Sequence, residues 1–65
     1  MTTFYKTIID LDTFVEKKVG EEVNSMKELP NGYFKFSTDN FIVELSVKED
    51  LYNGYEILAV DVEEK

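Results

Sequence analysis

The chain has 65 residues and a formal net charge of −7, which results from 14 acidic side chains against 7 cationic ones, all of them lysine. It contains no Cys and no His, so disulfides, Cys–His or Ser–His catalysis and a zinc site of Cys and His ligands are excluded. With 43% hydrophobic and 14% aromatic residues it can bury a compact core, and its length allows one domain, residues 1–65.

Residues 3–9 predict a first strand, because they are rich in β-forming side chains. Apolar residues then recur at three- and four-residue steps, which is typical of one stripe of an amphipathic helix. The residues of this stripe are Leu11, Phe14, Val15, Val19, Val23, Met26 and Leu29. Thr13 and Glu16 match the spacing of a capping box at its start, and Pro30 ends it. We expect one helix with Gly20 in its interior, where the helix approaches the sheet closely.

Two strands joined by a tight turn follow the helix. Residues 33–37 and 41–48 alternate between apolar and polar side chains, and Asp39-Asn40 between them is a two-residue turn signal. Such a turn fixes a register in which apolar residues face each other and opposite charges meet. The predicted pairs are Phe34 with Leu45, Phe36 with Val43, and Lys35 with Glu44.

A second hairpin signal, Asn53-Gly54, predicts a third strand at 55–62. A type I′ turn at this dipeptide places Val47 opposite Val60. The helix side of the sheet would then hold Phe34, Phe36, Phe41, Val43, Leu45, Val47, Leu58, Val60 and Val62. Tyr55 and Ile57 would point to the opposite side.

Together these elements predict an α+β fold: a strand, a helix and a three-stranded antiparallel meander (βαβββ), with one helix packed on one face of the sheet. We expect the first strand to run parallel to 33–37, because a helix that crosses back over a sheet connects parallel strands. Its neighbour in the sheet is either 33–37 or 55–62.

The sequence predicts no catalytic, cofactor or metal site. No Gly-rich loop matches a phosphate- or dinucleotide-binding pattern, and there is no Arg to clamp a phosphoryl group. Carboxylates remain, but one helix on one small sheet seldom encloses a pocket that shifts their pKa values. Asp10 with Asp12, and the acids at 61–64, lack the spacing of a calcium-binding loop. We expect a non-enzymatic protein without a cofactor.

The charge indicates what kind of partner the chain binds. Nucleic-acid and anionic membrane surfaces attract basic proteins, so we expect neither to be a direct ligand. No apolar run approaches the length of a membrane span, and we expect a cytoplasmic protein. Residues 49–65 contain six acidic side chains against one lysine and carry most of the excess charge. A basic protein is the expected partner.

The sheet face away from the helix is the predicted interaction surface, because nothing else in the chain would cover it. Tyrosines among carboxylates are typical anchors for a protein partner. The candidate partner-binding residues are Tyr33, Glu44, Tyr52, Tyr55, Glu56, Ile57, Asp61, Glu63 and Glu64. Support of the sheet through β-propensity explains the aromatic residues equally well.

These observations favour an acidic protein-binding module, an inhibitor or modulator of a larger basic protein that handles nucleic acid. Phages and mobile elements encode proteins of this class, whose carboxylates imitate the charge of nucleic acid. An acidic surface that only maintains solubility is the simpler explanation. The alternative is a self-assembling structural or accessory subunit, such as a homodimer, that pairs through the outer sheet face or an edge strand.

Overall fold

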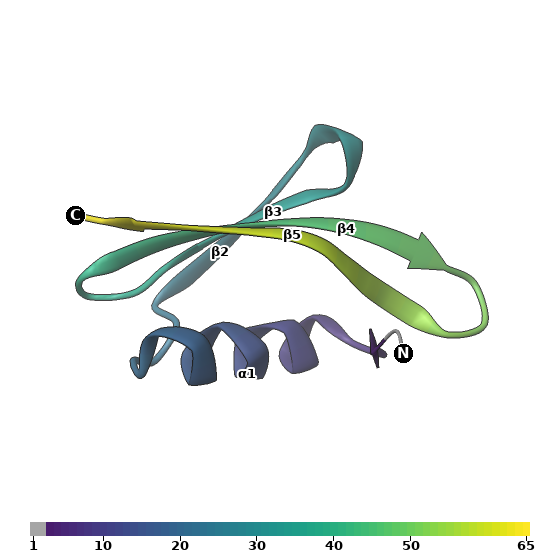
Figure 1. Cartoon of the computed structure of the whole chain (residues 1–65), viewed down its shortest axis with the longest axis horizontal. Coiled ribbons are helices and arrows are strands. Elements are labelled where there is room, and N and C mark those ends of the chain that lie inside the picture. The colour runs from purple at the N-terminus through teal and green to yellow at the C-terminus, as the bar shows by residue number, and fades with distance from the viewer. Residues whose placement is uncertain (1–2) are drawn as a thin grey trace.

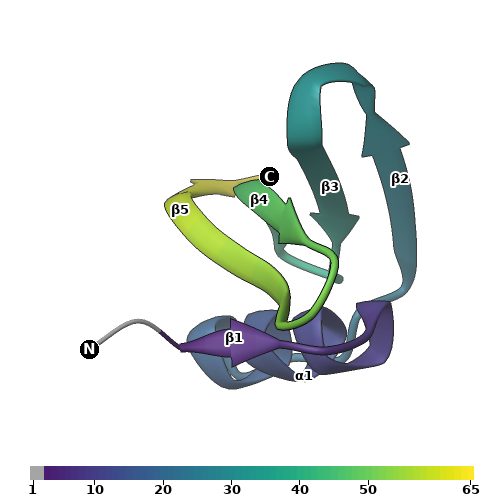
Figure 2. The ribbon, with the colours of Figure 1, turned by 90° about the vertical axis from the view of Figure 1, so that its right-hand side faces the viewer.

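The computed structural model describes residues 3–65 of the domain predicted at 1–65. One helix lies along one face of a curled antiparallel sheet (Figure 1). The elements are β1 (Phe4–Tyr5), α1 (Ile8–Val19), β2 (Ser25–Leu29), the 3-10 turn η1 (Pro30–Gly32), β3 (Tyr33–Ser37), β4 (Phe41–Asp50) and β5 (Gly54–Glu64). The strand order is β1-β5-β4-β3-β2 (Figure 2). A small single-domain α+β fold is therefore confirmed, with five strands instead of four.

Helix α1 begins and ends earlier than the sequence pattern predicts. Thr7 is its N-cap: the Thr7 hydroxyl accepts a hydrogen bond from the Asp10 N–H at 3.2 Å, and the Asp10 carboxylate accepts one from the Thr7 N–H at 3.1 Å. Gly20 ends the helix in the left-handed conformation, with φ 75°, and its N–H donates to the Glu16 carbonyl at 2.8 Å. The capping box predicted at Thr13 and the interior position of Gly20 are both wrong.

Residues 25–29 form the edge strand β2, where the sequence pattern predicts the end of the helix. Successive side chains of a strand point to opposite faces. Met26 therefore pairs with Phe36 on the helix side of the sheet, whereas Leu29 pairs with Tyr33 on the other side. Met26 and Leu29 are three residues apart, a spacing that fits one face of a helix. In a strand, the same spacing places the two side chains on opposite faces of the sheet.

Strand β1 lies beside β5 and antiparallel to it, so the expected parallel alignment with 33–37 is wrong. Four successive antiparallel pairs make β1 run in the same direction as β2 instead. The crossover through α1 thus connects the two edge strands of the sheet. The strand predicted at 3–9 is reduced to Phe4–Tyr5, because Thr7 already begins the helix.

The hairpin of β3 and β4 has the predicted register. A two-residue turn connects these strands, and the Thr38 N–H donates to the Phe41 carbonyl at 2.9 Å across it. The confirmed pairs are Phe34 with Leu45, Phe36 with Val43, and Lys35 with Glu44. Complementary side chains on both faces of this hairpin explain why its register could be predicted.

The hairpin of β4 and β5 differs from the prediction in both its turn and its register. Asp50 pairs with Gly54, so residues 51–53 form a three-residue loop, and Asn53 lacks the positive φ that a type I′ turn requires. The hairpin also contains a β-bulge. Ser46 pairs with Ala59, but Val47 pairs with Ile57, so Leu58 is an extra residue in β5. The predicted type I′ turn at Asn53-Gly54 and the predicted pair of Val47 with Val60 are therefore both wrong, because the longer loop and the bulge together shift the register so that Val60 pairs with Leu45. One extra residue reverses the side of every residue that precedes it in the strand.

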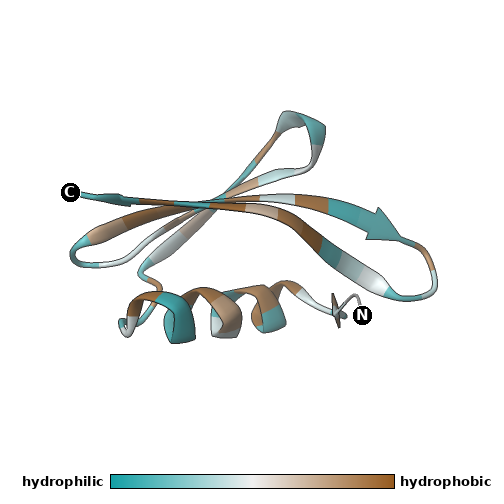
Figure 3. Cartoon of the chain, viewed as in Figure 1, coloured by the Kyte–Doolittle hydropathy of each residue, from teal (hydrophilic) through white to brown (hydrophobic). Residues whose placement is uncertain are grey.

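The core lies between α1 and the strands β3 and β4. Its buried apolar residues are Leu11, Val15, Phe34, Phe36, Val43, Leu45 and Val47. In Figure 3 hydrophobic and hydrophilic residues alternate along α1 and the strands. Leu58, Val60 and Val62 were expected in this core but remain 59%, 37% and 41% exposed. Strand β5 thus forms the margin of the core.

Glu21 joins the end of the helix to the turn between β3 and β4. Its carboxylate accepts hydrogen bonds from the Thr38 hydroxyl at 2.7 Å and from the Asn40 N–H at 3.0 Å. The bond from Thr38, followed by those from Asn40, lowers the pKa of Glu21 below its ordinary value of 4.5. Because the pKa of Glu21 is lower in the folded protein, its ionised carboxylate stabilises the fold at pH values above the ordinary pKa. This contribution is lost as the pH falls through the folded-state pKa.

We expect Glu21→Gln to lower the melting temperature at neutral pH, because a neutral amide accepts weaker hydrogen bonds than a carboxylate. The melting temperatures of the variant and the wild type should converge at acidic pH, where Glu21 is protonated. Thermal denaturation followed by circular dichroism over this pH range measures both effects. Glu22→Gln, at an exposed neighbouring position, is the matched control. A variant as stable as wild type at neutral pH contradicts the tethering role.

Candidate functional site

The sheet face away from α1, which we term the outer face, carries charges of both signs. One cross-strand row consists of Lys27, Lys35, Glu44 and Asp61, each paired with the next. The two lysines lie on β2 and β3, and the two carboxylates lie on β4 and β5. Along this row the outer face therefore changes from basic to acidic across the sheet, although the protein as a whole is acidic.

Three carboxylates on β4 and β5, those of Glu44, Asp61 and Glu63, form what we term the acidic patch. Ile42 lies beside them, because it pairs with Glu63, and the four side chains help to line a shallow hollow of about 300 Å³. No group of three or more acidic side chains within residues 3–65 is arranged to hold a metal ion. Carboxylates so close together favour cationic side chains in contact with them.

Four of the nine candidate residues share the outer face near this patch. They are Glu44, Asp61, Glu63 and Tyr33, and the last of these pairs with Ser46 and is exposed. Strand alternation brings them together as the sequence predicts, since each occupies an outward position of β3, β4 or β5.

Tyr55 and Ile57 lie on the helix side of the sheet, contrary to the sequence-based prediction. The β-bulge at Leu58 reverses the side on which both of them lie. The ring of Tyr55 packs edge-on against Phe34, with 5.8 Å between the ring centroids, and Ile57 packs against the same core. Both residues support the fold and do not belong to the outer face.

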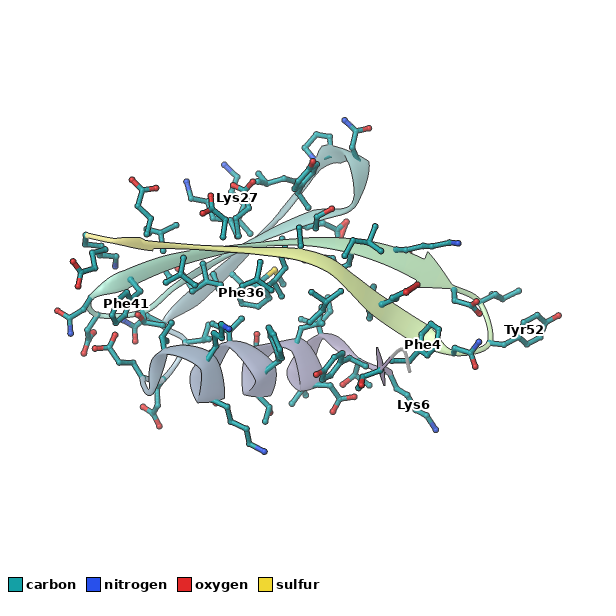
Figure 4. All side chains as sticks on the ribbon, viewed as in Figure 1. Phe4, Lys6, Lys27, Phe36, Phe41 and Tyr52 are labelled. Carbon is teal, nitrogen blue, oxygen red and sulfur yellow. The ribbon has the colours of Figure 1, made fainter. Side chains whose placement is uncertain are left out.

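The other three candidates lie apart from the acidic patch or at its margin. Tyr52 is 90% exposed in the loop between β4 and β5, at the end of the molecule opposite the C-terminus (Figures 1 and 4). Glu56 pairs with Lys48 on the outer face, not on the helix side as its alternation suggests. Glu64 pairs with Phe41 and lines the hollow of the acidic patch from its end.

A second surface, missed by the sequence analysis, lies between β1 and α1. It is an open hollow of about 660 Å³ with an aromatic floor, in which the rings of Tyr5 and Phe14 meet edge-on at 5.6 Å. We term it the lysine hollow; its lining residues are Phe4, Tyr5, Lys6, Asp10, Thr13, Phe14, Lys17 and Lys18. The residues that α1 contributes to this hollow recur at three- and four-residue steps. A helix predicted to begin at Thr7 would therefore have placed them on one face.

The surroundings of Asp12 raise its pKa above the ordinary value of 3.8. Burial is the main cause, and the nearby charge of Glu16 adds to it. Its Oδ1 atom is buried without a hydrogen-bond partner. A lone carboxyl group on a helix does not make a catalytic site, since acid–base catalysis needs a substrate pocket around it.

Comparison with protein families, curated proteins and solved structures finds no match to this chain. No helix within residues 3–65 is long and apolar enough to cross a membrane. The candidate site therefore has to be judged by its own geometry and charge.

Proposed function

We propose that this chain is a non-enzymatic protein-binding module that recognises a basic protein through the acidic patch. The observation that supports the proposal is the placement of Glu44, Asp61 and Glu63 together on an open sheet face, where Lys35 of the adjacent strand β3 pairs with Glu44 and Lys27 lies one strand further. A concentrated charge of one sign raises the association rate with an oppositely charged protein by roughly 10- to 1,000-fold at low salt.

The partner that suits this surface best is a protein with a cationic groove for nucleic acid. In that groove the carboxylates would take the place of phosphates, and the chain would act as an inhibitor or modulator. This part of the proposal rests on a class analogy with small acidic proteins of phages and mobile elements. Such an inhibitor would act in the cytoplasm and would bind no nucleic acid itself.

The proposal predicts that three amide substitutions weaken capture of the partner. The acidic-patch variant carries Glu44→Gln, Asp61→Asn and Glu63→Gln. Its matched control carries Glu22→Gln, Glu28→Gln and Glu49→Gln at exposed positions elsewhere, so both variants have the same net charge. We expect wild type and control to capture the same basic protein from extract of the native host at low salt, and the acidic-patch variant to capture at least about tenfold less.

Capture should also fall as salt is added, because Asp61 and Glu63 are exposed and their charges are screened by salt. Mass spectrometry identifies the captured protein and shows whether it is basic. Equal capture by the acidic-patch variant and its control would exclude the acidic patch as the binding site.

Self-assembly is a second candidate function, and the lysine hollow favours it. The hollow presents Lys6, Lys17 and Lys18 on the helix side of the sheet, whereas the acidic patch lies on the outer face. One copy could therefore dock its acidic patch on the lysine hollow of the next in a head-to-tail manner. Light scattering of the purified protein distinguishes self-assembly from binding of a basic partner, since a protein that stays monomeric at high concentration does not form the head-to-tail assembly.

A further inference from the structure

Within the described part of the chain, residues 3–65, strand β5 has one side along which no strand is paired for most of its length. Among residues 3–65, β1 pairs only with Tyr55 and Glu56 (Figure 2). From Val60 to Glu64, the described strand that pairs with β5 is β4 alone. An edge of this kind presents unpaired N–H and C=O groups to any extended chain that approaches it.

The backbone groups at this edge can be assigned from one hydrogen bond. The Lys65 N–H donates to the Asn40 carbonyl at 2.9 Å, on the β4 side. Along an antiparallel strand, residues direct their N–H and C=O groups alternately to the two sides. The groups of Val60, Val62 and Glu64 therefore point away from β4, toward the open edge.

The apolar rows of the helix side also end at this edge. Val43 and Leu45 of β4 are completely buried, but their partners on β5, Val62 and Val60, are 41% and 37% exposed. One further strand beside β5 would extend both rows by one residue and cover the two valines.

The charges along this edge determine which kind of strand can pair with β5. Asp61 and Glu63 alternate with the two valines and point to the outer face, where Glu44 lies beside Asp61. A second copy of β5 would bring a further set of carboxylates close to these, which is unfavourable. A strand with Lys or Arg at alternate positions would instead complement them.

The opposite edge of the sheet suits such a strand less well. Strand β2 offers five residues, and Lys27 on it lies beside Lys35 on the outer face. Positive charge on the outer face would repel the basic side chains of an added strand, so β5 is the edge that the charges favour.

We propose that a basic, extended segment of the partner adds to the sheet along Val60–Glu64 of β5. Its Lys or Arg side chains would face Asp61 and Glu63, and its apolar residues would lie beside Val60 and Val62. The inference rests on the proposed function and specifies how the basic partner is held: the carboxylates attract the segment, and main-chain hydrogen bonds to the β5 edge hold it.

A synthetic peptide of alternating Lys and Val, titrated into the isotope-labelled protein and followed by NMR, tests this mode of binding. We expect amide shifts and slower hydrogen exchange at Val60, Val62 and Glu64. The same peptide with N-methyl groups at alternate residues keeps its charge but cannot form the ladder, and should bind at least about tenfold more weakly. Equal binding of both peptides, or exchange slowed elsewhere and not at β5, overturns strand addition.

Val62→Pro provides the matched test on the protein side. Proline removes the N–H that points to the open edge and leaves the bonds to β4 in place. Val62→Ala removes side-chain contacts but keeps the N–H, and is the control. We expect Val62→Pro to bind the peptide at least about tenfold more weakly than Val62→Ala. If Val62→Pro fails to fold, the comparison of the two peptides on wild type decides.

The acidic-patch variant separates this inference from the proposed function. If that variant binds the peptide of alternating Lys and Val poorly, while Val62→Pro binds the same peptide as well as Val62→Ala does, charge recognition stands and strand addition is wrong. If the acidic-patch variant captures the basic protein as well as its charge-matched control does, the proposed function itself fails.

Discussion

Phe36→Ala is expected to leave little folded protein at room temperature. Phe36 is completely buried on β3, at the centre of a row formed with Met26 on β2 and Val43 on β4. Its truncation leaves a cavity in a core built from few side chains, at a cost of ~3–5 kcal/mol. A chain of this length has a total unfolding free energy of only ~3–10 kcal/mol.

Urea denaturation followed by circular dichroism measures this loss. Tyr52→Ala is the matched aromatic control, because Tyr52 is almost fully exposed in the loop between β4 and β5. We expect the control to change the unfolding free energy by less than ~0.5 kcal/mol. A Phe36→Ala protein that unfolds at the wild-type urea concentration would mean that the core is not centred on β3.

Gly54→Ala should be the next most damaging change, because two independent effects act at this position. Gly54 has φ 96°, and a left-handed backbone costs a residue with a side chain roughly 1–3 kcal/mol. In addition, a Cβ atom at Gly54 would lie 2.5 Å from the Tyr5 carbonyl oxygen and 2.8 Å from the Lys6 Cα. The backbone that leads from β1 into α1 would have to move.

Gly20→Ala separates the two effects. Gly20 also has a positive φ, of 75°, but a Cβ atom there meets nothing within 4 Å. We expect this control to lose about 1 kcal/mol from backbone strain alone, and Gly54→Ala to lose clearly more. Equal unfolding free energies of the two variants would show that β1 does not pack against the start of β5.

Local complementarity decided which parts of the fold could be predicted. The β3–β4 hairpin carries matching information on both faces, since Phe36 meets Val43 and Lys35 meets Glu44. The helix limits are predicted wrongly because Thr7 also fits a strand, and because a glycine within an apolar stripe fits an interior position as well as the C-cap that Gly20 forms. Strong local signals for both ends were present but ambiguous.

The candidate site was predicted only in part, for a similar reason. Glu44, Asp61 and Glu63 come together because strand alternation alone places them on the outer face. Tyr55 and Ile57 were misplaced because a β-bulge leaves no signature in a row of β-forming residues, yet it reverses the side of the residues that precede it. The lysine hollow depends on where α1 begins, which the pattern did not determine.

The dependence of the association rate on salt tests the central claim most directly. The rate is measured between the captured partner and three proteins: wild type, the acidic-patch variant and its charge-matched control. We predict that wild type and control associate rapidly at low salt and slow steeply as salt is added, whereas the acidic-patch variant starts at least about tenfold slower and depends little on salt. Identical rates and identical salt dependence for the two variants would contradict recognition through the acidic patch.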